Sequence, residues 1–400
     1  MVKYKMISPK ALILSIIFSL FIYLEYFQLS VKLIVTILAL TSFIFILKLS
    51  KKELFQSGFF IGVFWFWWVG ISFQYYDLSY LIPIVVIGMG LAYGSIFYLI
   101  GLSSNIYIRV AIIFILSFLA PFGFNWLKPE LLFINSYLGS SKIEFLAVLL
   151  ASALLIKYNL NRYSLISYFL IIVSLFFYNT FSSQKLTPST LKIYQYNTNI
   201  AQEKRWEREY KHTIINDNFK AIEDAIAKNY ELIILPETAF PLILNMQPNL
   251  TQKLLEYSQK ITILTGSLYQ KEKQLYNSTY LFDKGEIQIA NKVVLVPFGE
   301  AVPFPQKIRN LINDIFYDGA QDYQVAAEPT TFIIKKQKFR NAICYEATTD
   351  KIFENLDAKY MIAISNNAWF TPSIEPTLQK LLMKYFSKKY NVYIYSISNS

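Results

Sequence analysis

An acid, an amine and a thiol in the second half of this chain each lie beside or within a short apolar run. Glu237 follows the run in "LIILPETAFP", Lys292 lies inside "NKVVLVPFGEAVPF", and Cys344 ends the run in "NAICYEATT". An acid at the edge of a core can have a raised pKa that suits a general base. A fixed ammonium can stabilise an oxyanion, and a cysteine at a strand-to-helix elbow can act as a nucleophile.

Each of these positions also has a simpler explanation when it is considered alone. Glu237 suits the first turn of a helix, Lys292 suits the exposed face of a strand, and a lone cysteine is more often a small buried hydrophobe. Glu300, eight residues after Lys292 in a loop rich in Pro and Gly, can orient the ammonium or the substrate only under the catalytic interpretation. Residue types alone therefore leave the chemistry open.

The composition indicates a membrane protein with two regions in different solvents. Hydrophobic residues make up 54% of the chain and charged residues only 16%, against about a quarter in soluble domains. Residues 1–184 hold twelve Lys/Arg and five Asp/Glu, and residues 185–400 hold the other 26 and 22. The net charge of +11 is best explained by anionic lipid headgroups, because no basic run typical of nucleic-acid binding occurs.

The counts of cysteine and histidine exclude the common metal sites. A single cysteine excludes an internal disulfide and a multi-thiolate site, and a single histidine, His212, excludes a histidine cluster. We therefore expect neither a metal nor a cofactor.

Seven segments are apolar enough to predict membrane helices, each of which needs about 20 apolar residues. Basic residues of short loops stay in the cytoplasm, so the N-terminus is expected there and everything after about residue 181 on the far side. This predicts a transmembrane domain at 1–184 and an extracytoplasmic domain at 185–400. Between the fifth and sixth segments, an interfacial segment is expected with Trp126 at headgroup level, and a simple connector is the open alternative. The segments are 11–27, 31–49, 54–76, 80–102, 106–122, 143–158 and 164–181.

From Lys185 onward, short apolar runs alternate with amphipathic stretches, which predicts an α/β domain. Helices are expected at 207–228, 248–259, 348–356 and 374–389. Strands are expected at 191–197, 231–236, 261–267, 277–283, 287–294, 330–336, 340–346, 360–366 and 392–398.

The three reactive positions together resemble the Glu-Lys-Cys triad of the nitrilase superfamily. More narrowly, the chain resembles the apolipoprotein N-acyltransferase family, which also has a membrane region before the triad. The resemblance covers nearly the whole chain and implies an all-α transmembrane bundle followed by a nitrilase-like four-layer α-β-β-α sandwich. It rests on "YQYNTNIAQEKRW", "ILPETAFP", "YNSTYLF", "LVPFGEAVPF", "ICYE" and "ISNNAWF", in that family's order.

The resemblance implies a role for each matching residue. Glu237 would be the general base, Lys292 the oxyanion stabiliser and Cys344 the nucleophile. Glu300 and Glu346 would be supporting acids. Trp206 and Tyr345 match positions that the family ties to activity or substrate placement. Without the resemblance, Trp206 is explained as an interfacial aromatic and Tyr345 as a packing tyrosine. Asn199, Asn366 and Trp369 match further motif positions of the family, and we assign them no role beyond shaping the pocket.

The reaction implied is two acyl transfers through a thioester on Cys344. The donor would be a phospholipid such as phosphatidylethanolamine, and the acceptor the amine of the diacylglyceryl-cysteine of an apolipoprotein. The resemblance places the protein in the bacterial inner membrane with its catalytic domain in the periplasm, and we expect a monomer. A membrane-facing arm is expected at 303–319, with Phe304, Leu311, Ile315 and Phe316.

Two other functions stay open: a membrane-tethered amidase or nitrilase that uses water, and a non-enzymatic scaffold that keeps the fold. In the family, further strands and a final span follow the strand matched by 392–398, whereas this chain ends at Ser400. The sequence is thus expected to be either a naturally short form or incomplete.

Overall fold

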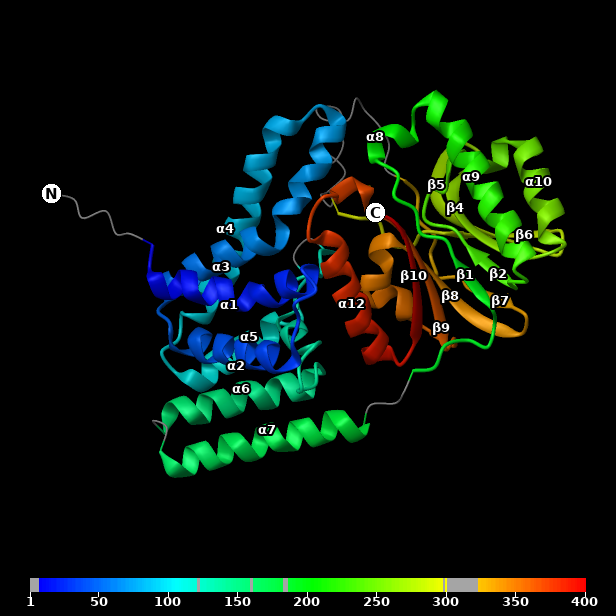
Figure 1. Cartoon of the computed structure of the whole chain (residues 1–400). Helices are drawn as coiled ribbons and strands as arrows, with labels where there is room; N and C mark the ends of the chain where they lie inside the picture. Colours follow the sequence, from blue (N-terminus) through cyan, green and yellow to red (C-terminus); the bar gives the residue numbers. More distant parts are fainter. Residues whose placement is uncertain (1–6, 121–122, 159–160, 183–185, 298, 301–322) are drawn as a thin grey trace. The chain divides into compact units, whose positions relative to one another are not determined.

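The protein, seen in a computed structural model, forms two compact units (Figure 1). The first comprises Met1–Pro121, Asn125–Gln184 and Ser373–Tyr385, and the second comprises Phe122–Phe124, Lys185–Pro372 and Phe386–Ser400. The structure describes residues 7–120, 123–158, 161–182, 186–297, 299–300 and 323–400, so the expected arm at 303–319 lies outside the described residues.

In the first unit, a helix forms in each of the seven apolar segments. α3 and α6 begin at capping boxes, in which Ser50 pairs with Glu53 and Ser141 with Glu144. The 3-10 turns η1 Trp67–Tyr76 continue α3, and η2 Ser79–Leu81 leads into α4. The helices are α1 Pro9–Tyr26, α2 Lys32–Lys48, α3 Lys51–Phe66, α4 Ile82–Ile100, α5 Ile106–Leu116, α6 Lys142–Lys157 and α7 Arg162–Ser182.

Among the described residues, three stretches have the length and apolar character to cross a membrane: Pro9–Tyr26, Lys51–Tyr76 and Ser79–Ile100. Two further apolar helices, Ile106–Leu116 and Ser164–Tyr178, are shorter. The number of crossings, and with it the orientation, stays a prediction.

α5 ends at Leu116, earlier than the expected residue 122. The Ser117 hydroxyl donates to the Phe114 carbonyl at 2.6 Å, and the Lys142 ammonium donates to the Ser117 carbonyl at 2.6 Å. The Lys142 ammonium thus supplies a donor to a carbonyl that the helix could not satisfy, because residue 121, four positions on, is proline and has no backbone N–H.

Glycines allow α3 and α4 to pack backbone against backbone. A Cβ atom at Gly58 would lie 2.5 Å from the Tyr93 carbonyl oxygen, and one at Gly62 would lie 2.7 Å from that of Met89. Both distances are too short for any larger residue. Small residues one turn apart are the usual basis of close helix packing in membranes.

Trp126, expected at the level of the lipid headgroups, is buried in the first unit. Its ring centroid lies 5.2 Å from that of Trp68. In the 3-10 turn η4 Pro129–Phe133 that follows, the buried Glu130 carboxylate pairs with the Lys142 ammonium at 2.6 Å. Trp126 therefore does not face the headgroups as expected, because this connector folds inward around a buried ion pair; the depth of the connector stays a prediction.

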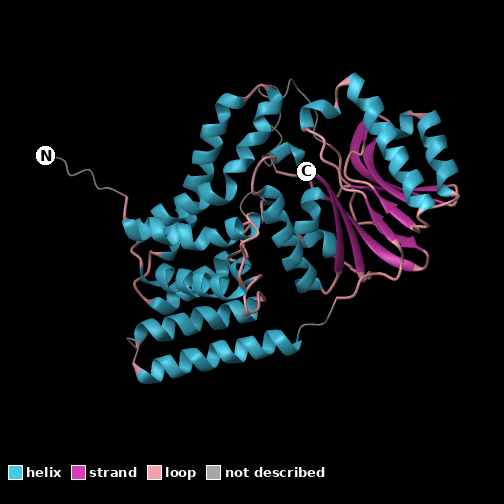
Figure 2. Ribbon diagram, viewed as in Figure 1, coloured by secondary structure: helices cyan, strands magenta, loops and turns pink. Residues whose placement is uncertain are grey.

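The second unit contains two β-sheets (Figure 2). The first sheet has the order β1-β2-β4-β5-β6 with β3 beside β4, and the second has the order β10-β9-β8-β7. Strands β1, β2 and β4 are parallel, as are β8, β9 and β10. The bounds are β1 Ile193–Gln195, β2 Leu232–Ile234, β3 Phe240–Ile243, β4 Thr262–Lys271, β5 Gln274–Asp283, β6 Glu286–Asn291, β7 Thr331–Ile334, β8 Gln337–Ile343, β9 Tyr360–Asn366 and β10 Tyr393–Asn399.

The two sheets pack through one buried apolar cluster. Leu232 and Ile234 of β2 belong to it, together with Ile343 of β8 and Ile364 of β9. These short strands are apolar on both faces, as expected for parallel strands that are covered on each side.

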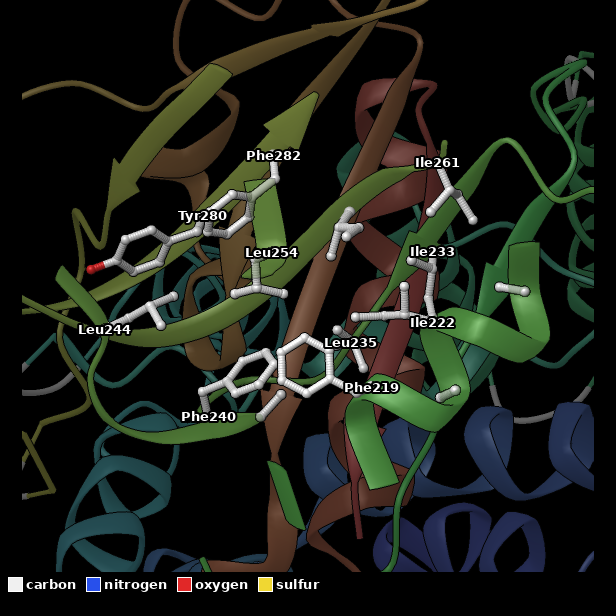
Figure 3. Packing of buried hydrophobic residues seen from close by; sticks show 14 residues of the cluster. Phe219, Ile222, Ile233, Leu235, Phe240, Leu244, Leu254, Ile261, Tyr280 and Phe282 are labelled. Carbon is white, nitrogen blue, oxygen red and sulfur yellow. The ribbon is translucent and has the colours of Figure 1, made fainter. Parts of the chain in front are cut away.

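Helices α9 Arg208–Ala227 and α10 Pro248–Ser258 cover the other face of the first sheet (Figure 3). Phe219 and Ile222 of α9 and Leu254 of α10 pack there against Ile233 and Phe282. The unit has the nitrilase-like α/β sandwich that the sequence predicts.

Two local predictions are wrong in the second unit. The segment 348–356 is not an α-helix but contains the 3-10 turns η6 Cys344–Thr348 and η7 Asp350–Phe353. The hydroxyls of Thr348 and Thr349 donate to the Tyr345 and Glu346 carbonyls and so compete with α-helical hydrogen bonds. Strand β3 was not expected, because Pro241 interrupts its apolar run. The last expected helix is α12 Glu375–Tyr390.

Candidate active site

Strand direction brings the three candidate residues to one edge of the sandwich. Glu237 lies three residues beyond β2, Lys292 directly follows β6, and Cys344 directly follows β8. Because β4–β5 and β5–β6 are both antiparallel, β6 points the same way as β4 and its parallel neighbour β2. Glu237 and Lys292 therefore stand at the same edge of the first sheet.

The acid, the amine and Glu300 form one buried charged cluster. Lys292 is 0% exposed, and its ammonium lies 2.6 Å from Glu300 Oε2 and 4.0 Å from Glu237 Oε1. Cys344 is half-buried and lies within electrostatic range of Lys292. Two carboxylates and an ammonium thus share one buried site, and the thiol of Cys344 is an electrostatic neighbour of that ammonium.

Asn277 of β5 joins the two carboxylates of this cluster, and sequence reasoning gave it no role. Its side-chain amide donates to Glu237 Oε1 at 2.7 Å and to Glu300 Oε1 at 2.9 Å. The backbone carbonyl of Asn277 accepts from the Lys292 backbone N–H at 3.0 Å. The available signal was the polar run Asn277–Ser278–Thr279 inside an apolar strand, because buried polar side chains need partners.

Burial and neighbouring charges set the protonation of the cluster. Burial raises the pKa of Glu237, and the carboxylate of Glu300 raises it further, while Lys292 opposes both effects. For Lys292, burial alone would lower the pKa, but the carboxylates of Glu300 and Glu237 raise it above its ordinary value. The result is a permanent ammonium beside a carboxylate with increased proton affinity, which is what a general base requires.

Cys344 occupies a sharp elbow at the end of β8. Its backbone has φ +54°, in the left-handed region that a non-glycine residue seldom adopts. The sequence predicts such an elbow, but the structure continues it with the short 3-10 turn η6 instead of an α-helix. A strained turn of this kind holds a nucleophile away from its own strand.

Glu346 braces the elbow against the segment that carries Lys292. Its buried carboxylate accepts from the backbone N–H groups of Ile343 at 2.7 Å and Val294 at 3.0 Å, and also from that of Val293. Burial raises the pKa of Glu346 to about 7. Its position fits a supporting acid that fixes backbone geometry.

Tyr345 and Trp206 make contacts with residues outside the charged cluster. The Tyr345 hydroxyl donates to the Gly123 carbonyl at 2.7 Å, and its ring stacks on Phe124. Trp206 is 42% exposed, with the Lys211 ammonium 5.5 Å from its ring centroid.

The other family-motif positions are divided between surface and interior. Asn199 is exposed and Trp369, in the 3-10 turn η8 Asn367–Phe370, is half-buried. Asn366, at the end of β9, is buried, and its backbone N–H donates to Glu237 Oε2 at 2.7 Å. Within the described ranges, no group of three or more His, Cys, Asp or Glu side chains is arranged to hold a metal ion.

Both halves of the chain match families of known proteins. Residues 4–177 match the apolipoprotein N-acyltransferase integral membrane domain, and residues 193–399 match the carbon-nitrogen hydrolase family.

Named relatives match along nearly the whole length. Apolipoprotein N-acyltransferase from Wolinella succinogenes is 42% identical over 97% of this chain and 93% of its own. The enzyme of that name from Helicobacter pylori is 36% identical over 91% of this chain and 85% of its own. Among solved structures, a CN-hydrolase superfamily protein from Xanthomonas campestris superposes with a TM-score of 0.40 and 14% identity, covering 52% of this chain and 76% of its own.

Proposed function

This chain belongs to the apolipoprotein N-acyltransferase family, and from that premise we propose that it transfers an acyl chain from a membrane phospholipid to the N-terminal amine of a diacylated apolipoprotein. The observation that carries the proposal is the buried ammonium of Lys292, paired with Glu300 at 2.6 Å, 4.0 Å from Glu237 and within electrostatic range of Cys344. Nucleophilic catalysis by a thiol needs these three kinds of group together.

In the first half of the reaction, Cys344 takes the acyl chain. Glu237 accepts the thiol proton, and the sulfur attacks the ester carbonyl of a phosphatidylethanolamine-like lipid. A free thiol has a pKa near 8.5, so such a base is needed at neutral pH. The ammonium of Lys292 stabilises the oxyanion. The ester C–O bond breaks, the proton passes from Glu237 to the leaving alkoxide, and a lysophospholipid departs.

In the second half, the acceptor amine takes the acyl chain from the thioester. The nitrogen attacks the thioester carbonyl, Glu237 accepts the proton that the nitrogen loses, and the C–S bond breaks. The thiolate of Cys344 recovers the proton, and the product is an amide. Lys292 stabilises the second oxyanion as it does the first.

The proposal includes the placement of the enzyme. We place it as a monomer in the bacterial inner membrane, with several spans and the catalytic unit on the periplasmic side. The apolar helices and the loop distribution of Lys and Arg support this arrangement. Both substrates carry acyl chains, so a pocket tethered at the bilayer meets them without transfer through bulk water.

Intact-mass spectrometry of the purified protein mixed with phosphatidylethanolamine tests the mechanism. We expect an acyl-sized mass increase on the wild-type chain and none on Cys344→Ala, since Cys344 is the only thiol. Adding a diacylated lipopeptide should then remove the adduct and yield the N-acylated peptide.

Two outcomes would contradict the proposal. Release of free fatty acid at the same rate with and without lipopeptide would favour a hydrolase that uses water. Full N-acylation by Cys344→Ala would remove the thioester from the mechanism altogether.

A further inference from the structure

Arg205 is a buried cation that the reaction above does not use. It is the last residue of α8 Gln202–Arg205 and is 1% exposed. Burial lowers its pKa to about 10, although the charge of Glu237 opposes that shift, so it is a cation at neutral pH. A buried guanidinium is retained only where hydrogen-bond acceptors surround it.

Arg205 donates to two backbone carbonyls at the Glu237–Thr238 turn and to the side chain of Asn366, which lies at the end of β9 in the second sheet. Nη2 donates to the Glu237 carbonyl at 3.1 Å and to the Thr238 carbonyl, and Nη1 donates to Asn366 Oδ1 at 2.9 Å. Asn366 in turn donates its backbone N–H to Glu237 Oε2 at 2.7 Å. One guanidinium thus fixes both the backbone of Glu237 and the residue that binds its carboxylate.

The turn held by Arg205 is strained. Thr238 has φ +51°, a left-handed conformation that is costly for a β-branched residue. On its other side, a Cβ atom at Gly266 of β4 would lie 2.6 Å from both Glu237 Cα and the Thr238 nitrogen. Strained turns persist only where the surroundings fix them from several sides, and here β4 and Arg205 supply those sides.

The far end of this network is also anchored. Asn366 Nδ2 donates to Gln202 Oε1 at 2.9 Å, and Asn399 Nδ2 donates to Asn366 Oδ1 at 2.9 Å. Asn399 is the last residue of β10, which pairs with β9. The guanidinium therefore rests on a fixed strand end and not on a loose loop.

We propose that Arg205 is a positioning residue for the general base: it clamps the left-handed Glu237–Thr238 turn to the end of β9, so that the carboxylate of Glu237 is held toward the Cys344 thiol. This rests on the proposed function in assigning Glu237 as the base. Loss of the clamp lets the turn relax, and misplacement of a catalytic group by about 1 Å can cost about 100-fold in rate.

Alkylation of Cys344 by iodoacetamide across about pH 5 to 9 tests the proposal, because the chain has one thiol and its reactivity reports proton removal. Arg205→Lys keeps the charge but loses the bidentate geometry. We expect its alkylation profile to move toward that of a free thiol, near pH 8.5. We also expect kcat to fall about 10- to 100-fold with little change in KM for phospholipid. The exposed Arg208, as Arg208→Lys, is the matched control and should leave both unchanged.

A second substitution separates positioning from general stabilisation. Thr238→Gly removes the cost of the left-handed turn. In the Arg205→Lys background it should therefore move the alkylation profile part of the way back to that of the wild type and restore part of kcat. Asn366→Ser removes the acceptor of Nη1 together with the side-chain bonds to Gln202 and Asn399, but leaves both carbonyl acceptors of Arg205 in place. It should therefore shift the alkylation profile in the same direction as Arg205→Lys, by less.

Two results would overturn the proposal. The first is a wild-type alkylation profile in folded Arg205→Lys; if its melting temperature is also lower, Arg205 is merely structural. If Arg205→Lys does not fold, a wild-type profile in Asn366→Ser decides against it. The proposed function fails separately, by N-acylation that survives Cys344→Ala.

Discussion

Replacing Lys292 by methionine should damage stability and activity for two different reasons. The ammonium is fully buried and is the cation that lies 2.6 Å from Glu300 and 4.0 Å from Glu237. Removing one partner of a buried ion pair typically costs about 3–5 kcal/mol. For a unit of this size each kcal/mol corresponds to about 2–4 °C in melting temperature, so Lys292→Met should melt about 6–20 °C lower. Loss of an oxyanion stabiliser adds a fall in kcat of about 100- to 1000-fold.

A double mutant separates the two effects. In Lys292→Met/Glu300→Gln the uncompensated charge at position 300 is gone, so much of the lost stability should return. Activity should not return, because no cation remains to stabilise the oxyanion. Thermal unfolding in detergent and transfer of a labelled acyl chain to a lipopeptide measure the two quantities. The reasoning is refuted if Lys292→Met melts like the wild type, or if the double mutant regains acyl transfer.

Three further changes test other parts of the structure. Asn277→Ala removes a hydrogen-bond donor shared by two carboxylates, at about 1.5–3 kcal/mol, and should slow thioester formation about 10- to 100-fold in a stopped mass-spectrometric time course. Glu300→Gln removes a charge that raises the pKa of Glu237. Since the base works only when deprotonated, the acid limb of the kcat/KM profile should move to lower pH, and a shift to higher pH would contradict this. Gly62→Ile should prevent close packing of α3 on α4 and lower the yield of folded protein, whereas Gly88→Ala, with open space around its Cβ position, should express normally.

Much of the second unit could be predicted from local patterns. The strands with continuous apolar runs, such as 261–267 and 360–366, correspond to β4 and β9, because such runs are buried on both sides in any α/β arrangement. The sequence also predicts that Glu237 and Cys344 lie at strand ends, because each follows or ends one of these apolar runs. What the sequence could not supply was the distance between them, which depends on how two separate sheets pack.

The failures share a physical cause, which is that distant partners decided the local structure. The Lys142 ammonium binds the Ser117 carbonyl where α5 ends, and Trp126 packs against Trp68. Neither partner lies near its target in the sequence, so periodicity cannot reveal it. Arg205 was passed over for a similar reason, because an arginine in the charged run "EKRWERE" resembles an ordinary surface position until its carbonyl partners are known.

The tie between Asn399 and Asn366 makes the network around Glu237 depend on β10. A chain made from its N-terminus presents the thiol of Cys344 well before β10 exists to hold Asn366, and hence before the network around Glu237 is complete. Pairings between residues far apart in sequence form late in folding. The hydrogen-bond network around Glu237 is therefore complete only once β10 has joined β9 in the sheet.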